Sequence, residues 1–427
     1  VGPATAAPSL EHAGLAQGAT PSPGCASGCG LAVSQAAISV DPKITRRLLD
    51  AVGGQCELVP AAVKPPGIWS PEDWASLLRL AVNNGVGSYL HAHVSQLTHR
   101  DSEAEAMFLH LRQRAQLCTY RSLAMRAELV RVLKAFGDAD IATIPLKGPI
   151  LADRFYARPG LREFGDLDLL VAEADRERAW QLLLENGYHS PYENHDLGNR
   201  YHVVFRHRQT DELVELHWRI AGPQFGRYYR GEFLWEGAEK RDYRGGLAIL
   251  EPQVEGTLLY LAIHAYKHGW ARLQWLMDFP EVIARASSLD WDRLSALAQS
   301  QHAHKLLRAT LQLARWVFPN AANAPTNHPL AQPAMSAKQL DRVARLMVSP
   351  ASDAQALMNF FALQVSMAET WRDKLRLVTY SLRPSDRDDE FLTLPPLLRP
   401  FRFMVRPLRL LGRMIRGRSR DAEMRHH

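Results

Sequence analysis

Between residues 141 and 218 the apolar side chains leave the 3.6-residue period of a helix and form short β-branched or alternating segments. Two helical stretches interrupt these segments. The predicted elements follow the order β-α-β-α-β-β, over residues 141–146, 149–156, 166–171, 173–185, 201–207 and 213–218, with a hairpin turn at 209–211. This order predicts a mixed sheet with helices on one face, which is an α+β core.

Helical patterns flank this core on both sides. The run Ser70-Pro71-Glu72-Asp73 combines an N-cap, a proline at the first helical position and first-turn acids, which predicts a helix start. Residues 103–136 are expected to form one long helix or two. Further helices are expected over 251–347, broken at Pro280 and Pro319, and over about 353–381, with a linker at 320–337.

Five regions follow from these patterns. We expect a disordered Ala/Gly/Ser/Pro tail and an N-terminal helical region before the core, then a C-terminal helical domain and a basic Pro/Arg-rich tail. Their predicted bounds, with the core in the middle, are 1–42, 43–137, 138–250, 251–385 and 386–427.

The composition is that of an ordinary globular protein, with 46% hydrophobic and 22% charged residues in 427. The longest apolar runs are far shorter than the roughly 18–20 residues of a membrane span. The four cysteines, Cys25, Cys29, Cys56 and Cys118, do not complete a zinc-binding pattern, so we expect free thiols in a reducing compartment. Because the first 42 residues also lack a signal-peptide pattern, the expected location is the cytoplasm.

The net charge of +6 comes from one stretch, because residues 399–420 hold eight arginines and no acid. The rest of the chain is close to neutral, so we expect no sequence-specific nucleic-acid partner. From 399 to 416 the arginines recur every three or four residues, as on one face of a helix. This face suits a peripheral contact with an anionic membrane or an acidic partner. Packing along the protein body is the alternative, and Pro400 and Pro407 oppose one continuous helix.

The segment Gly165-Asp166-Leu167-Asp168-Leu169-Leu170 carries the strongest chemical signal. Side chains two residues apart share a face of a strand, so Asp166 and Asp168 point the same way. Two close carboxylates repel, and one is pushed towards protonation unless a cation lies between them. Magnesium or manganese prefers oxygen ligands of this kind. Solvated acids at a sheet edge are the alternative interpretation.

A third carboxylate, Glu215, lies in the strand predicted at 213–218 and shares its face with His217. If this strand neighbours the aspartate strand, Glu215 completes a three-carboxylate cluster. Such a cluster holds one or two metal ions in enzymes that transfer phosphoryl groups. His217 is expected either to orient Glu215, to touch substrate or to be a satisfied core histidine.

A phosphate site is expected at Lys147-Gly148, where the first strand turns into a helix. Gly148 would let a phosphate approach the backbone, and Lys147 would supply a positive charge. Arg162 is a further phosphate candidate. A glycine at such a turn has a purely conformational role in the alternative interpretation.

Residues of the later helical region allow two interpretations each. His264 and His268 lie four apart, a spacing that suits a metal site, a nucleotide cleft shared with Lys267, or simple packing. Asp278 is expected to cap a helix or to contact a substrate. The tryptophans Trp218, Trp270 and Trp275 are expected as core or interface anchors rather than base-stacking platforms.

These motifs together resemble the uncharacterised nucleotidyltransferase family of the polymerase-β superfamily, over about residues 70–415. The matching segments are Leu146-Lys147-Gly148, Arg162 with 165–171, Gly187-Tyr188, 214–218, 264–270, 275–278 and the tail pattern at 394–410. The resemblance implies a minimal nucleotidyltransferase fold, polymerase-β-like, with N- and C-terminal helical regions beside it. It also implies that Asp166, Asp168 and Glu215 are the metal ligands. Lys147-Gly148 replaces the usual Gly-Ser of the superfamily, and the gap to Asp166 is longer than usual.

We therefore expect an enzyme that moves a nucleoside monophosphate from an NTP to an unidentified acceptor and releases pyrophosphate. Mg²⁺ or Mn²⁺ would be the cofactor, and Lys147, Gly148, Arg162 and Lys267 would bind the nucleotide. The acceptor, whether small molecule, peptide or protein, is not indicated. Two alternatives stay open: glycosyl transfer from a sugar nucleotide at the same metal site, and a non-catalytic nucleotide-binding scaffold.

Overall fold

The computed structural model describes residues 71–95, 102–158, 160–192, 200–225, 227–319, 321–348 and 354–381. All of the described residues belong to one compact unit. The expected tails at 1–42 and 386–427, the N-cap Ser70 and three of the four cysteines lie outside the described residues. Of the helices described, none is both long and apolar enough to cross a membrane.

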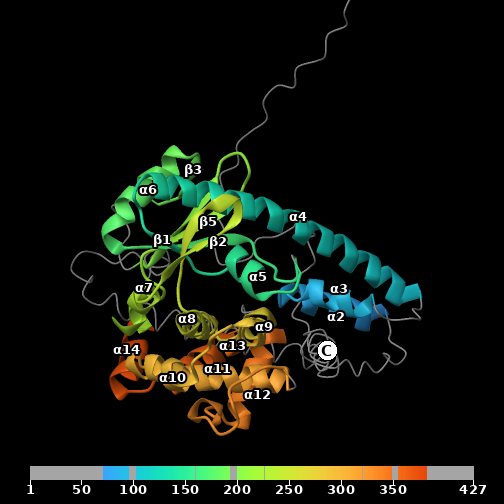
Figure 1. The fold of residues 1–427 in the computed structure, drawn as a ribbon. Coiled ribbons are helices and arrows are strands. Elements are labelled where there is room, and N and C mark those ends of the chain that lie inside the picture. Colours follow the sequence, from blue (N-terminus) through green and yellow to red (C-terminus); the bar gives the residue numbers. More distant parts are fainter. Residues whose placement is uncertain are drawn as a thin grey trace, which may run out of the picture. The chain divides into compact units, whose positions relative to one another are not determined.

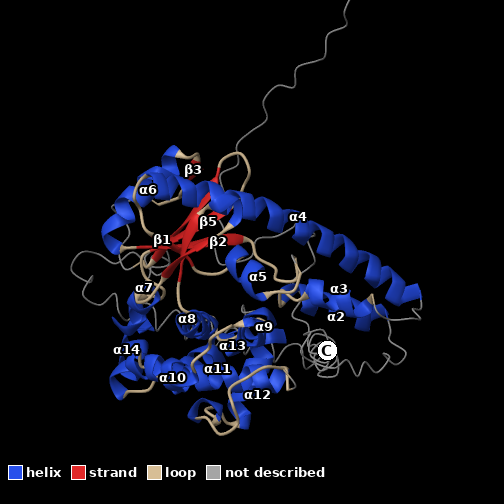
Figure 2. Cartoon of the chain, viewed as in Figure 1, coloured by secondary structure: helices blue, strands red, loops and turns tan. Residues whose placement is uncertain are grey.

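A mixed five-stranded sheet lies at the centre of the α+β core, as predicted (Figure 2). Its strands are β1 (Thr143–Pro145), β2 (Asp166–Val171), β3 (Tyr188–His189), β4 (His202–His207) and β5 (Leu213–His217), in the order β1-β2-β5-β4-β3. Only β2 and β5 are parallel, and the other neighbours are antiparallel. The two-residue β3 is not predicted from the sequence, since it is too short to show alternation.

Helices α4 (Ser102–Asp138) and α6 (Arg176–Glu185) cover one face of the sheet (Figure 1). From β2 this face receives Leu167, Leu169 and Val171, which pack with Met125 of α4 and Trp180 of α6. Asp166 and Asp168 alternate with these leucines and therefore point to the opposite face. The apolar pattern of β2 thus turns the carboxylates away from the core.

Helix α5 (Pro149–Phe155) follows the Lys147-Gly148 turn and is held in place by Asp153. This carboxylate accepts hydrogen bonds from Arg126 Nε at 2.7 Å, Tyr243 Oη at 2.7 Å and Arg244 Nε at 3.0 Å. Partial burial acts to raise the pKa of Asp153, but the three donors outweigh it and hold the pKa below its ordinary value. Asp153 therefore ties α5 both to α4 and to the turn at residues 243–244.

Beyond the central sheet lies a small two-stranded sheet of β6 (Glu239–Asp242) and β7 (Ala248–Glu251). Its sequence offered little signal, because the β6 residues are all exposed and charged. The remaining helices are α2 (Pro71–Asn83), α3 (Gly87–Val94), α7 (Glu232–Trp235), α8 (Val254–Lys267), α9 (Leu273–Arg285), α10 (Trp291–Ser300), α11 (His304–Val317), α12 (Ala337–Val348), α13 (Ala354–Met367) and α14 (Trp371–Ser381).

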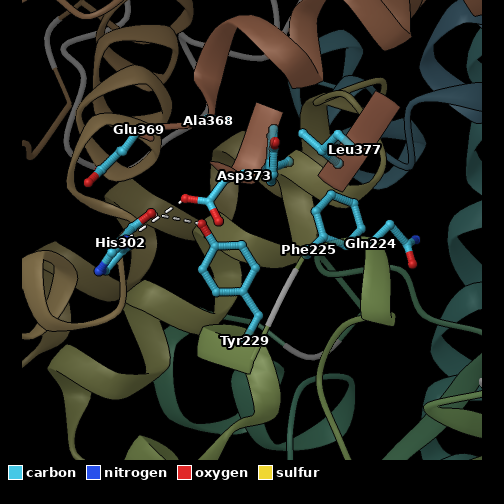
Figure 3. Close-up of a pocket in the computed structure, with 9 residues that line it drawn as sticks. Gln224, Phe225, Tyr229, His302, Ala368, Glu369, Asp373 and Leu377 are labelled. Atoms are coloured by element: carbon cyan, nitrogen blue, oxygen red, sulfur yellow. Dashed lines mark hydrogen bonds and ion pairs between the residues drawn. The ribbon is translucent and has the colours of Figure 1, made fainter. Parts of the chain in front are cut away.

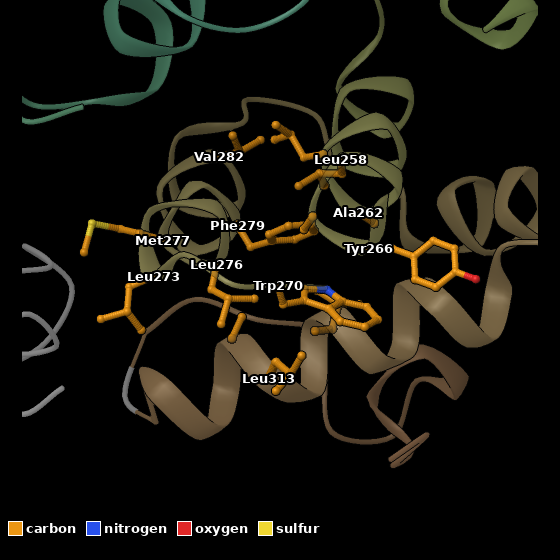
Figure 4. Packing of buried hydrophobic residues seen from close by; sticks show 14 of the residues in the cluster. Leu258, Ala262, Tyr266, Trp270, Leu273, Leu276, Met277, Phe279, Val282 and Leu313 are labelled. Atoms are coloured by element: carbon orange, nitrogen blue, oxygen red, sulfur yellow. The ribbon is translucent and has the colours of Figure 1, made fainter. Parts of the chain in front are cut away.

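One large apolar core joins α2 and α3 to helices that come much later in the chain. Trp270 is fully buried in it, among Leu276, Phe279 and Leu313 (Figure 4). Its indole Nε1 donates a 2.9 Å hydrogen bond to Thr310, so Trp270 is a core anchor as expected. The N-terminal and C-terminal helical regions therefore share a core, and the predicted domain bounds stay a prediction.

Two helix predictions need correction. Pro280 does not end a helix but lies inside α9. An interior proline costs about 3 kcal/mol, whereas burying one large apolar side chain contributes about 1.5–3 kcal/mol, and Met277, Phe279 and Val282 around it are all fully buried. Packing thus outweighs the break. The helix expected over 353–381 is two helices, α13 and α14.

Candidate active site

Asp168 and Glu215 are direct partners in the register of the parallel strands β2 and β5. Neighbouring strands lie about 4.8 Å apart, and the alternation of both strands places the two carboxylates on the face opposite α4 and α6. Ligand atoms of Asp168, Glu215 and His217 all lie within 4.8 Å of one another. The prediction that these strands are neighbours is confirmed, and the three side chains could hold a metal ion.

His217 joins the two carboxylates through one nitrogen. Its Nε2 lies 3.2 Å from Glu215 Oε2 and 3.3 Å from Asp168 Oδ1, and its side chain is 3% exposed. Because an ionised carboxylate only accepts, Nε2 carries the hydrogen and donates. Burial acts to lower the pKa of His217, but hydrogen bonds to both carboxylates outweigh it and raise the pKa. His217 therefore orients Glu215, one of the roles expected for it.

Lys147 lies in direct contact with this cluster, with Nζ 3.1 Å from Asp168 Oδ2. Burial opposes its charge, yet Asp166 and Asp168 raise the pKa of Lys147 well above its ordinary value. Oδ2 itself is buried and accepts no well-aligned hydrogen bond from the described residues. The contact is therefore a charge–charge contact, and Oδ2 keeps a lone pair that suits a metal ion.

Burial acts to raise the pKa of Asp168, and Lys147 and His217 together hold it below its ordinary value. The pKa of Glu215 is held well below its ordinary value in the same way, with burial outweighed mainly by His217 and His202. Both carboxylates are therefore ionised at neutral pH. Two ionised oxygen ligands fit Mg²⁺ or Mn²⁺, so the donor set agrees with the expected cofactor.

Asp166 lies two residues before Asp168 on the same face, outside the group whose ligand atoms are mutually within 4.8 Å. Burial, together with the charges of Asp168 and Glu215, raises the pKa of Asp166 to about 6, although Lys147 acts against the rise. Burial is the largest cause of this rise in pKa, and the expected repulsion between close carboxylates adds to it. The structure thus gathers Asp168, Glu215 and His217, and a metal-ligand role for Asp166 stays a prediction.

Gly148 has φ +64° and ψ −124°, a conformation that favours glycine. A Cβ at this position would meet the backbone oxygen of Asp166 at 3.4 Å, so the turn lies directly beside the aspartate strand. Helix α5 that follows has only seven residues, and Pro149 has no amide hydrogen. Lys147 is therefore a stronger phosphate candidate than the helix amides.

The structure places Arg162 in a buried ion pair. Its Nε and Nη2 donate to the two oxygens of Asp278 at 2.8 and 2.9 Å, and Tyr156 Oη donates to the same carboxylate at 2.5 Å. Both charged side chains are at most 4% exposed. Asp278 therefore neither caps a helix nor lies open to a substrate here. The phosphate role of Arg162 stays a prediction.

Helix α8 contributes the wall that faces the carboxylates. Lys267 Nζ donates to the backbone oxygen of Ile220 at 2.9 Å and lies 4.9 Å from the ring centre of Tyr201, which in turn lies 6.2 Å from the His217 ring. Through Tyr201 and His217 these contacts place Lys267 on the side of the carboxylate cluster, which is a position that suits a nucleotide contact. Its role in nucleotide binding stays a prediction.

His264 and His268 pack with Trp275, at ring distances of 5.3 and 5.1 Å. Burial, followed by the charge of a nearby lysine, lowers the pKa of both histidines, in the case of His268 to about 3. They are neutral, and no His/Cys/Asp/Glu cluster of the described residues includes them. The structure thus favours packing over a metal site for this pair.

Sequence reasoning missed His202. Its ring stacks on His217 at 4.8 Å with an interplanar angle of 14°, and its Nε2 lies 3.9 Å from Glu215 Oε2. Burial, followed by the charge of His217, lowers the pKa of His202 to about 3. The signal was present, because His202 and His217 are register partners across the hairpin whose turn was predicted.

A small surface cavity lies apart from the carboxylate cluster (Figure 3). It is lined by Gln224, Phe225, Tyr229, Tyr266, His302, Ala368, Glu369, Asp373 and Leu377. Tyr229 Oη donates to the backbone oxygen of His302 there, at 3.1 Å. None of the predicted site residues lines this cavity.

Asp168 and Glu215, which the resemblance implies as metal ligands, are thus paired on adjacent parallel strands. A model of the uncharacterised nucleotidyltransferase family matches residues 70–319, well over half of the chain. The chain belongs to this family. No curated protein matches it. The uncharacterised nucleotidyltransferase match spans α2 to α11 and therefore includes every predicted site residue.

Proposed function

We propose that this protein is a metal-dependent nucleotidyltransferase with a polymerase-β-like core. It would transfer a nucleoside monophosphate from an NTP to a hydroxyl of an acceptor molecule and release pyrophosphate. The observation that carries the proposal is the register pairing of Asp168 with Glu215, joined by His217, on the sheet face opposite α4 and α6. Membership of the nucleotidyltransferase family supports it.

Asp168 and Glu215 would hold the metal ion, with Asp166 beside them. A Mg²⁺ or Mn²⁺ ion held there would supply Lewis acidity to the phosphate groups. His217 keeps both ligands oriented through its Nε2 hydrogen, as second partners of metal ligands commonly do.

The remaining groups act on the nucleotide and the acceptor. Lys147 would pair with the triphosphate, and Lys267 at the end of α8 would supply a second positive charge. Glu215 would take the proton of the acceptor hydroxyl as its oxygen attacks the α-phosphorus. The bond between the α-phosphorus and the bridging oxygen then breaks, and pyrophosphate leaves with the electron pair of that bond.

Asp168→Asn tests the proposal with the least change in shape. Wild type and variant are incubated with each labelled NTP, Mg²⁺ and a cell extract as the acceptor source, and labelled products and pyrophosphate are measured. We expect wild type to label an acceptor and Asp168→Asn to lose at least about 100-fold in rate, because a ligand charge is lost. A matched control is Asp341→Asn on α12, whose carboxylate is exposed.

The same assay separates the two alternatives. A sugar-nucleotide donor would yield a nucleoside diphosphate in place of pyrophosphate. Metal-dependent NTP binding with no turnover on any acceptor would support the scaffold interpretation. Equal product formation by wild type and Asp168→Asn would contradict the proposed mechanism.

A further inference from the structure

The contact between Lys147 and Asp168 has a consequence for metal binding. Lys147 Nζ lies 3.1 Å from Asp168 Oδ2, and the two side chains are 13% and 1% exposed. The ammonium therefore lies within contact distance of an oxygen that the metal ion would use. It is also held in a poorly solvated place, where charges are only weakly screened.

A free divalent ion at Asp168 and Glu215 would face two obstacles. It would compete with the ammonium for Oδ2, and it would leave a buried lysine next to a doubly charged cation. The negative charge of the cluster is thus partly neutralised by Lys147 before any metal ion binds.

A metal ion that arrives bound to a triphosphate meets a different situation. The triphosphate brings several negative charges, and Lys147 can pair with these oxygens in place of Asp168. The turn that carries the lysine adjoins β2, since Leu146 N donates to Asp168 O at 2.9 Å and Gly148 packs on Asp166 O. The backbone of the turn is therefore anchored on β2, and a change of partner by Lys147 would be a movement of its flexible side chain alone.

We propose that Lys147 makes the site select the metal–nucleotide complex over the free metal ion. By competing for Asp168 it weakens binding of the free ion, and by pairing with phosphate it strengthens binding of the nucleotide. The two ligands are thereby coupled through one side chain. This inference rests on the proposed function, because it assumes a metal ion at Asp168 and Glu215.

Lys147→Met tests the proposal, because methionine keeps the length of the side chain without its charge. Binding of Mn²⁺ alone is measured from the electron paramagnetic resonance signal of the free ion. Binding of labelled α,β-methylene analogues of ATP, GTP, CTP and UTP is measured by equilibrium dialysis at saturating Mg²⁺. We expect Lys147→Met to bind Mn²⁺ at least about tenfold more tightly and the preferred nucleotide at least about tenfold more weakly than wild type.

These opposite changes separate competition from a structural role, which would weaken both ligands together. Lys305→Met is the matched control, because Lys305 Nζ donates to the backbone of Ser366 in the helical region. It should leave both affinities unchanged. If Lys147→Met does not fold, Lys147→Arg decides: its forked guanidinium should hold Asp168 more firmly and weaken Mn²⁺ binding.

The outcomes distinguish this inference from the proposed function. Equal or weaker Mn²⁺ binding by Lys147→Met overturns the competition but leaves the metal site standing. Unchanged or tighter Mn²⁺ binding by Lys147→Arg likewise overturns the competition and leaves the metal site standing. Absence of Mn²⁺ binding by every protein overturns both proposals.

Discussion

Asp278→Asn should destabilise the fold strongly, because it removes one charge from a buried pair and leaves the other. Arg162 and Asp278 are 4% and 1% exposed, and the guanidinium donates two hydrogen bonds to the carboxylate. Removal of one partner of a buried ion pair costs about 3–5 kcal/mol. The amide keeps the shape of the side chain but can accept from Arg162 at only one atom. We therefore expect a loss of about 3–5 kcal/mol.

Urea unfolding, followed by far-ultraviolet circular dichroism, measures the loss. Asp341→Asn is the control, because its partner Arg345 is 68% exposed and Asp341 itself is 58% exposed. Exposed pairs contribute about 0–1 kcal/mol. If Asp278→Asn costs no more than this control, the buried pair does not have the role assigned to it.

The double variant Arg162→Met with Asp278→Leu asks whether the arginine binds phosphate. Replacement of a buried pair by apolar side chains is often neutral or stabilising, so most of the lost stability should return. Nucleotide affinity, measured by equilibrium dialysis, should then stay near the wild-type value, because both arms of Arg162 are engaged by Asp278. A loss of affinity in the folded double variant would instead support the phosphate role predicted from the sequence.

Three further predictions concern single residues. The pKa of Asp153 is lowered on folding, so its stabilising effect is complete above about pH 4 and is lost as the pH falls through the folded pKa. In Asp153→Asn the free energy of unfolding in urea should therefore fall less steeply at acid pH than in wild type. An equally steep fall would contradict this prediction. His217→Ala should weaken Mn²⁺ binding about 10- to 100-fold in the resonance titration, as losses of orienting partners do, and equal binding would speak against its bridging role. Gly148→Ala should lower the free energy of unfolding by about 1–2 kcal/mol, because φ is positive at this position. Gly137→Ala should raise it by about 0.5–1 kcal/mol, because Gly137 lies in α4 with open space around it. Urea unfolding compares the two variants, and equal effects would refute the conformational argument.

The strand positions of the core were predictable because the sheet buries one face. Alternation in 166–171 fixes which side chains enter the core, and Asp166 and Asp168 are what remains for the other face. The hairpin turn then pairs β5, the strand of Glu215, with β4. The elements and their faces therefore follow from local pattern, and the family resemblance is confirmed.

Side-chain partners were less predictable, because they depend on which distant segments meet. Arg162 and Asp278 are 116 positions apart, and no local pattern links them. His202 depends on the register of a hairpin, where a shift by one residue would move it to the other face. Pro280 was misjudged for a related reason, since the packing that tolerates it in α9 comes from other helices.

Arg162 and Lys147, two of the residues predicted to bind phosphate, differ in how firmly their charged groups are held by other side chains. Arg162 donates from both arms to one buried carboxylate, and its release would leave Asp278 a buried charge with Tyr156 as its remaining donor among these contacts. Lys147 holds Asp168 through one charge contact, without a well-aligned hydrogen bond. Its flexible stem allows the ammonium to change partner, whereas a forked guanidinium loses two bonds at once. We therefore expect Arg162 to shape the site through its fixed pair with Asp278 and Lys147 to bind the ligand.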